Sequence, residues 1–189
     1  CLTEEPTEWL YLLGEERRIV GISGYTVRPP RARDEKPKVS AYLSAKIDKI
    51  VDLKPDCVIG FSDLQADIAA QLIRHGIQVT IFNQRSVAEI FSMMYQLAAM
   101  VGQVERGMVL IGQMQQRLLD IEQAARSLKR RPKVFFEEWH DPHISCNHLH
   151  RHAVAHLVAG IAQQICHHVF HELRTAAHAF AGLGNLPHR

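Results

Sequence analysis

Residues 47–59 read IDKIVDLKPDCVI, and this stretch decides the fold class. Its first half carries apolar residues at the three- and four-residue steps of a helix, which Ser44 can cap. Pro55 ends this helix because its ring cannot continue the hydrogen-bond pattern. Residues 57–61 then form a short apolar run, the pattern of a buried strand. A helix joined directly to a buried strand is one unit of an α/β sheet.

The same alternation runs through the first hundred residues, with a glycine or proline near most of the changes. The predicted elements are, in order, the end of a strand at 1–2, a helix at 6–13, a strand at 18–23, a loop at 24–38, the helix and strand just described, a helix at 64–74, a strand at 78–82 and a helix at 86–101. Repeated units of this kind predict a parallel sheet covered by helices.

A longer helix follows. From Val104 to Leu128 the apolar residues recur in steps of three and four, which predicts one amphipathic helix of about seven turns. Pro132 ends it, and residues 133–137 begin another strand. We therefore expect an α/β lobe at 1–102, a long inter-lobe helix at 103–131, and an incomplete second α/β lobe at 132–189.

The composition excludes several classes of protein. The 22 basic and 20 acidic residues leave a net charge of +2, so charge indicates neither a nucleic-acid nor a membrane-surface partner. No apolar stretch reaches the ~20 residues of a membrane span. The cysteines lie far apart, at 1, 57, 146 and 166, so we predict no disulfide framework. No phosphate-binding or nucleophile motif is present, which favours binding over catalysis and predicts that the protein is not an enzyme.

The first residues, Cys1 and Leu2, resemble the end of a strand more than a natural start, because a helix begins within five residues. A lipidated cysteine is the alternative interpretation, but such a cysteine is normally followed by a flexible polar tether. We therefore interpret the start as truncated.

Several short sequence segments, taken in their order along the chain, resemble the cobalamin and iron-siderophore class of periplasmic substrate-binding proteins of ABC importers. They lie at 19–25 (IVGISGY), 28–30 (RPP), 37–40 (PKVS), 47–59, 72–79 (LIRHGIQV) and 86–90 (SVAEI). The resemblance covers about residues 1–145, and FFEEW at 135–139 is similar to the cobalamin-binding subgroup. It implies two α/β lobes that are joined by one long helix and clamp a ligand between them.

This resemblance implies a site at the carboxyl ends of the strands, where the loops converge. The transported ligand would be a corrinoid (cobalamin) or a ferric chelate such as haem or a siderophore, and broad, partly apolar ligands suit aromatic side chains with a polar rim. The expected ligand-binding residues are Glu5, Tyr25, Tyr42, Phe61, Ser62, Asn83, Glu138 and Trp139. No catalytic residue, resident metal or catalytic cofactor is expected.

Several of these residues also have a plainer interpretation, in which they serve the structure and not a ligand. Glu4 and Glu5 could form a catalytic acid pair, but acids just ahead of a helix more often serve its positive end. Tyr25 and Trp139 could simply pack. On a strand, Glu137 and Glu138 point to opposite faces, so only one of them can face a cleft.

The resemblance also implies a partner and a location. The partner is an ABC permease, whose arginines dock on carboxylates of the lobes, and Glu15, Glu16 and Asp34 are candidates for that contact. The protein is expected to be a monomer outside the cytoplasmic membrane, with no export signal in this chain.

The composition changes beyond Ser145, and 11 of the 12 histidines lie between His140 and His188. Pairs four residues apart, such as His148 and His152, can share a metal ion on a helix, so a metal-binding tail is the alternative function. Carboxylate partners are nearly absent there, and the spacing matches no named zinc pattern. A shifted reading frame over 146–189 is a further hypothesis that resequencing tests, and a small α/β enzyme is a third function.

Overall fold

The computed structural model describes residues 1–127, 129, 137–140 and 143–145. The chain forms two compact units, Cys1–Gln84 with Glu89–Met108, and Arg85–Ala88 with Val109–Arg189. The elements are α1 (Glu4–Leu13), the 3₁₀ turn η1 (Glu16–Arg18), β1 (Ile22–Ser23), α2 (Ala32–Glu35), β2 (Lys38–Ser40), α3 (Ile47–Asp52), β3 (Cys57–Phe61), the 3₁₀ turn η2 (Asp63–Gln65), α4 (Ala66–Arg74), β4 (Gln78–Phe82), α5 (Val87–Met100), α6 (Val104–Arg126), β5 (Glu137–His140) and β6 (His143–Ser145).

The first unit contains two parallel sheets of two strands each. β1 pairs with β2, and β3 pairs with β4 in unbroken register. The first residues join the pairs, because the α-amino group of Cys1 donates to the Gly21 carbonyl (2.9 Å) and the Leu2 N–H donates to the Ile59 carbonyl (2.8 Å). Residues 1–2 form no strand of their own, but these two bonds place them between the two strand pairs.

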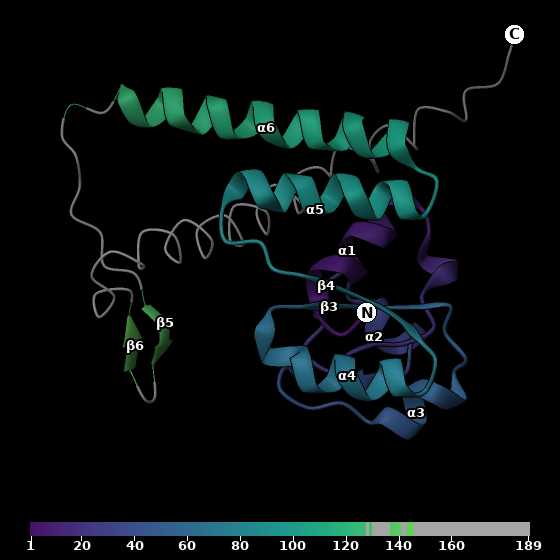
Figure 1. Ribbon diagram of the computed structural model, residues 1–189. Helices are drawn as coiled ribbons and strands as arrows, with labels where there is room; N and C mark the ends of the chain where they lie inside the picture. The colour runs from purple at the N-terminus through teal and green to yellow at the C-terminus, as the bar shows by residue number, and fades with distance from the viewer. Residues whose placement is uncertain (128, 130–136, 141–142, 146–189) are drawn as a thin grey trace, which may run out of the picture. The chain divides into compact units, whose positions relative to one another are not determined.

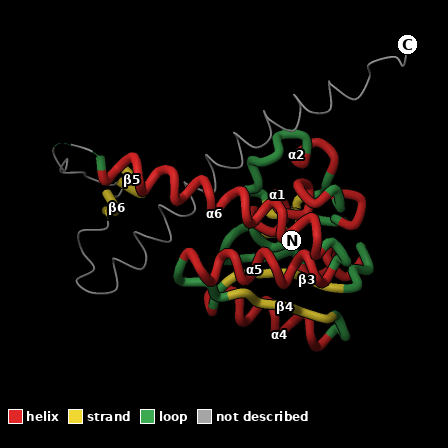
Figure 2. The backbone as a smooth tube through the Cα atoms, turned by 90° about the horizontal axis from the view of Figure 1, so that it is seen from above, coloured by secondary structure: helices red, strands yellow, loops and turns green. Residues whose placement is uncertain are grey.

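Helices cover both faces of the sheet formed by β3 and β4. Figure 1 shows α3 and α4 on one side of β3 and β4, and α1 and α5 on the other, and Figure 2 shows β3 and β4 between α5 and α4 from above. The buried cluster on the first side contains Leu2, Val39, Ile50, Val58, Ile68 and Leu72. Burying each large apolar side chain stabilises the fold by about 1.5–3 kcal/mol. On the other side Trp9 is fully buried, and its indole N–H donates to the Met94 carbonyl (2.8 Å), which ties α1 to α5.

α5 and the start of α6 pack closely at Gly107. A Cβ at this position would lie 2.6 Å from the Cβ of Ala98, closer than packed atoms approach. Gly102, between the two helices, has φ +74°, a backbone conformation that glycine adopts without strain. The Arg106 guanidinium donates to the Leu12 carbonyl (3.0 Å), so the start of α6 is also tied to α1.

The predicted α/β class is confirmed, and β3 and β4 occupy the predicted residues. The strand predicted at 18–23 is wrong in length, because residues 16–18 form η1 and only Ile22–Ser23 pairs with β2. The loop predicted at 24–38 contains α2, and β2 follows it without having been predicted. Ser44 does not cap α3, since the residue at that position is Lys46 and the Ser44 carbonyl accepts from the Ala41 N–H within a turn.

The long helix α6 begins at the predicted residue and spans 23 residues. β5 and β6 form an antiparallel pair in the second unit, while most of the strand predicted at 133–137 lies outside the described residues. The histidine-rich tail, to which the reading-frame hypothesis applies, also lies outside the described residues. The predicted boundaries of the two lobes and the inter-lobe helix stay predictions. In the described part of the chain, no helix combines the length and apolar character needed to cross a bilayer.

Candidate functional site

The loops that follow β1, β2 and β3 meet at one edge of the first unit. The Gly24 N–H donates to the Ser40 carbonyl (2.8 Å), which joins the loop after β1 to the end of β2. The Gln65 side-chain amide donates to the Tyr42 carbonyl (3.0 Å), which joins the loop after β2 to the end of β3. This is the carboxyl edge of parallel strands, the position at which α/β sheets bind their ligands.

Five large apolar side chains on these loops are exposed to solvent. They are Tyr25, Val27, Tyr42, Leu43 and Leu64, and their exposed fractions run from 40% for Tyr42 to 66% for Leu43. We call these five residues the edge cluster. Single exposed apolar residues are ordinary, but their concentration on three adjoining loops is typical of a binding surface.

The sequence had named Tyr25 and Tyr42 but not the aliphatic members of the edge cluster. Leu43 was missed because β2 was not predicted, so the segment after it was not recognised as a loop at the carboxyl edge. Leu64 was assigned to the following helix, whereas it lies in η2. A signal was present, since Leu43 directly follows Tyr42 and Leu64 lies two residues after Ser62, both predicted site residues.

Other predicted site residues lie around the same edge. Phe61 is half-buried at the end of β3, and its N–H donates to Oε1 of Gln65 (3.0 Å). Ser62 is buried, and its hydroxyl accepts from the Leu64 N–H (3.3 Å) within the turn. Asn83 is exposed just after β4, and Glu5 is half-buried in the first turn of α1. Their roles as ligand contacts stay predictions.

The two remaining predicted residues, Glu138 and Trp139, lie in β5. Their strand belongs to the second unit, whereas the edge cluster belongs to the first. Their contribution to a ligand site also stays a prediction.

Acidic side chains gather beside the edge cluster. The Arg28 guanidinium lies 2.9 Å from the Glu8 carboxylate, and both side chains are largely buried. Burial raises the pKa of Glu8 to about 7, although Arg28 opposes the shift. Burial and the neighbouring Glu5 also raise the pKa of Glu4. Glu4 and Glu5 lie in the first turn of α1, where acids serve the positive end of a helix, and this agrees with the plainer interpretation of that pair.

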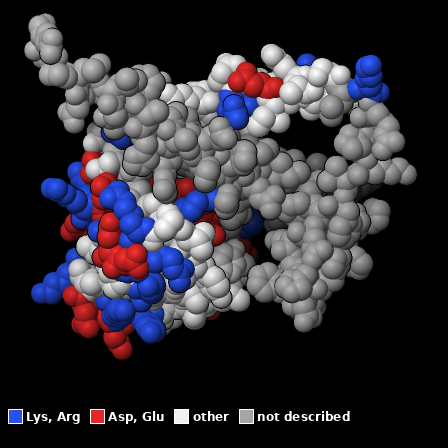
Figure 3. Space-filling view, turned by 180° about the vertical axis from the view of Figure 1, so that it is seen from behind, with Lys and Arg blue, Asp and Glu red and all other residues white. Residues whose placement is uncertain are grey.

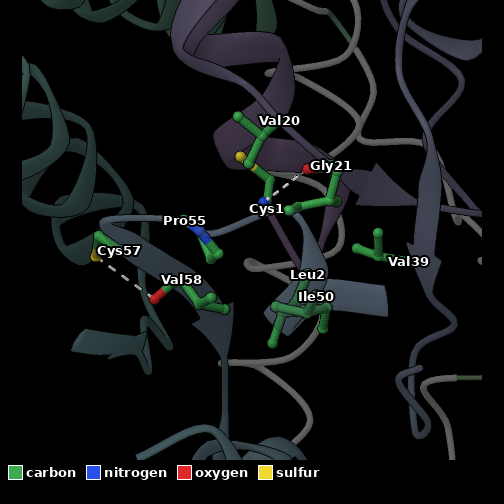
Figure 4. Close-up of a pocket in the computed structure, with 10 residues that line it drawn as sticks. Cys1, Leu2, Val20, Gly21, Val39, Ile50, Pro55, Cys57 and Val58 are labelled. Carbon is green, nitrogen blue, oxygen red and sulfur yellow. Dashed lines mark hydrogen bonds between the residues drawn. The ribbon is translucent and has the colours of Figure 1, made fainter. Parts of the chain in front are cut away.

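A small pocket lies at the opposite, amino-terminal ends of β1 and β3. Figure 4 shows Cys1, Gly21, Pro55 and Cys57 around it, with the Cys1 amino group bonded to Gly21. Both cysteines are free thiols. Because the loops of the carboxyl edge do not line this pocket, we do not assign the ligand to it.

Three acids were candidates for permease docking, and the structure places two of them in ion pairs. Glu15 pairs with Arg18 (2.6 Å) and Glu16 with Arg31 (3.3 Å). Asp34 is exposed on α2. On the face drawn in Figure 3, basic and acidic side chains of the described residues are interspersed, in keeping with the small net charge.

The comparisons with known proteins agree with this fold. The family described as periplasmic binding protein matches residues 1–159. The chain therefore belongs to the periplasmic binding protein family. No curated protein sequence matches it.

Among solved structures, the chain is similar to three proteins whose names give different ligands. One is the periplasmic heme-binding protein RhuT from Roseiflexus sp. RS-1 in apo form, with a TM-score of 0.65, 23% identity, and coverage of 72% of this chain and 52% of that one. Another is the vitamin B12 binding protein BtuF of Vibrio cholerae, with a TM-score of 0.64, 25% identity, and coverage of 76% and 56%. A third is a possible iron-binding protein from Staphylococcus epidermidis ATCC 12228, with a TM-score of 0.63, 19% identity, and coverage of 74% and 55%. This chain thus spans about half the length of each.

Proposed function

We propose that this chain captures a corrinoid, or else a ferric chelate such as haem or a siderophore, outside the cytoplasmic membrane and delivers it to the permease of an ABC importer. The protein acts as a monomer without a covalent step, so its output is selective binding. The family and the ligands in the names of its structural relatives support this class of function.

The observation that carries the proposal is the edge cluster. Its two phenol rings and three aliphatic side chains offer a broad apolar surface at the sheet edge where ligands bind in α/β folds. Aromatic side chains contribute large contact areas to planar ligands. A flat macrocycle matches this surface better than a small hydrophilic chelate does.

Charge beside the edge cluster favours a corrinoid over an anionic chelate. Glu4, Glu5 and Glu8 lie near one another, and Arg28 lies beside Glu4 and Glu8. Arg33 reaches the same loops, where it donates to the Gly24 and Thr26 carbonyls. These five groups leave no surplus of positive charge to attract carboxylates or catecholates, whereas uncharged amide substituents of a corrin ring can donate to carboxylates.

Calorimetric titration of the purified chain with cyanocobalamin, hemin and a ferric hydroxamate tests the proposal. We expect one-to-one binding of cyanocobalamin at micromolar or lower Kd, weakened about tenfold or more by Tyr42→Ala. Tyr95→Ala is the matched control, because Tyr95 is an exposed tyrosine on α5. Tighter binding of hemin would reassign the ligand, and no binding of any of the three would contradict the proposal.

For the permease contact, we propose Asp34. It is exposed, whereas Glu15 and Glu16 are held by arginines of this chain. A charge reversal, Asp34→Lys, is expected to reduce binding to the permease and to leave ligand binding unchanged. Equal permease binding by the variant and the wild type would remove this assignment.

A further inference from the structure

We infer that Gln65 is a positioning residue whose buried amide holds together the two loops that carry most of the edge cluster. Its consequence for ligand binding rests on the proposed function, whereas its effect on the loops does not. Gln65 was not singled out from the sequence, where it is one of many glutamines.

Both the oxygen and the nitrogen of the Gln65 side-chain amide form hydrogen bonds. Its Oε1 accepts from the Phe61 N–H at the end of β3 (3.0 Å), and its Nε2 donates to the Tyr42 carbonyl in the loop after β2 (3.0 Å). Since one partner can only donate and the other can only accept, they define the orientation of the amide. One side chain thereby links two loops that are 19 residues apart in the sequence, from Tyr42 to Phe61.

The surroundings of this amide are tightly packed. Gln65 is fully buried, and a Cβ on Gly60 would lie 2.6 Å from its Oε1. Ser62 adopts φ +64°, unusual for a residue with a side chain, and the Gln65 N–H donates to the Ser62 carbonyl (3.2 Å). The turn after β3 and the Gln65 side chain therefore form one packed arrangement.

Because Gln65 is fully buried, it acts on a ligand only through the residues it holds. It is bonded directly to the backbone of Tyr42, which is next to Leu43, and it directly follows Leu64. Loops that are already ordered lose less conformational entropy when a ligand binds, so holding them raises affinity without a new contact. A buried hydrogen bond that is broken leaves its partner unsatisfied, which opposes this ordering.

Amide hydrogen exchange of the whole chain tests the loop effect without a ligand. We expect Gln65→Met, which preserves the side-chain size, to speed exchange at Phe61 and at Ala41 and Lys46, whose N–H groups donate to the Ser44 and Val39 carbonyls on either side of Tyr42, by about tenfold or more. Gln71→Met is the matched control, since the Gln71 amide is exposed and donates to the Asp67 carbonyl within α4. Similar exchange in both variants and the wild type would overturn the inference.

Gln65→Glu separates the two bonds. A carboxylate can still accept from the Phe61 N–H but cannot donate to the Tyr42 carbonyl until it is protonated. We therefore expect faster exchange at Ala41 and Lys46 at neutral pH and partial recovery as the pH is lowered, with each rate compared with that of the wild type at the same pH. Protonation also removes the cost of burying a charge, so the link to Tyr42 requires a recovery confined to the loop after β2, and equal recovery at Phe61 or no recovery at all would remove it.

Binding measures the consequence for function. With cyanocobalamin as the probe, we expect Gln65→Met to weaken binding about tenfold, and to weaken it much less when Tyr42→Ala is already present, because both changes act on one loop. Fully additive effects would contradict positioning through Tyr42. If the wild type binds no probe, the proposed function fails, and the exchange experiment alone decides whether Gln65 holds the loops.

Discussion

At the scale of single residues, Glu8 combines burial with an ion pair. Its pKa is raised to about 7 by burial, even though Arg28 lies within 2.9 Å. A carboxyl whose pKa is higher in the folded state stabilises that state most at pH values below the unfolded pKa, and the contribution disappears as the pH rises through the folded pKa. Glu8 should therefore make the protein less stable as the pH rises from 4.5 towards 7.

Replacing Glu8 by glutamine should remove this pH dependence. We expect the free energy of unfolding of the wild type to lose up to about 3 kcal/mol over this range through Glu8, and Glu8→Gln not to show this loss. Urea unfolding at several pH values measures it. The control is Glu122→Gln, because Glu122 is an exposed partner of Arg126. A Glu8→Gln curve parallel to that of the wild type would mean that Glu8 titrates normally.

The α-amino group of Cys1 changes the stability of this chain with pH in the opposite direction. Burial lowers its pKa from 8.0 to about 6, so its stabilising contribution is complete above pH 8 and is lost as the pH falls through about 6. The wild type and both glutamine variants share this group. The difference between their curves therefore isolates Glu8.

At the scale of elements, long apolar patterns were predictable and short strands were not. The residues of β3 and β4 form runs of five in which apolar side chains dominate. β2 has one apolar residue, Val39, and its partner β1 pairs over only two residues, so both depend on contacts distant in sequence. The missing strand then hid the loop that holds Tyr42 and Leu43. Within the edge cluster, the two tyrosines were named because aromatic rings suit a broad apolar ligand, and the three aliphatic members were missed.

The packing of α5 against α6 gives a prediction at this scale. Gly107→Ala should lower the free energy of unfolding by about 1–3 kcal/mol, because the new methyl would meet Ala98. Gly112→Ala, on the same helix, meets no atom within 4 Å and should raise it by up to about 1 kcal/mol, since alanine favours helices. Urea unfolding of both variants checks this, and equal effects would contradict the packing described at Gly107.

At the scale of the whole molecule, the first unit by itself presents the edge cluster, the acidic group around Glu8 and the Gln65 bridge. The chain spans about half the length of its solved relatives, so the activity of a whole importer component is a proposal for this sequence. The central claim is narrower. It states that a ligand binds at the carboxyl edge of this sheet, against the loops after β1, β2 and β3.

Hydrogen exchange of the chain with and without saturating cyanocobalamin tests that claim most directly. We expect the ligand to slow exchange at residues 24–28, 41–45 and 61–65 and to leave residues 95–100 of α5 unchanged. Protection confined to the opposite end of the sheet, around Cys57, or no protection at these three loops in a saturated sample, would contradict it.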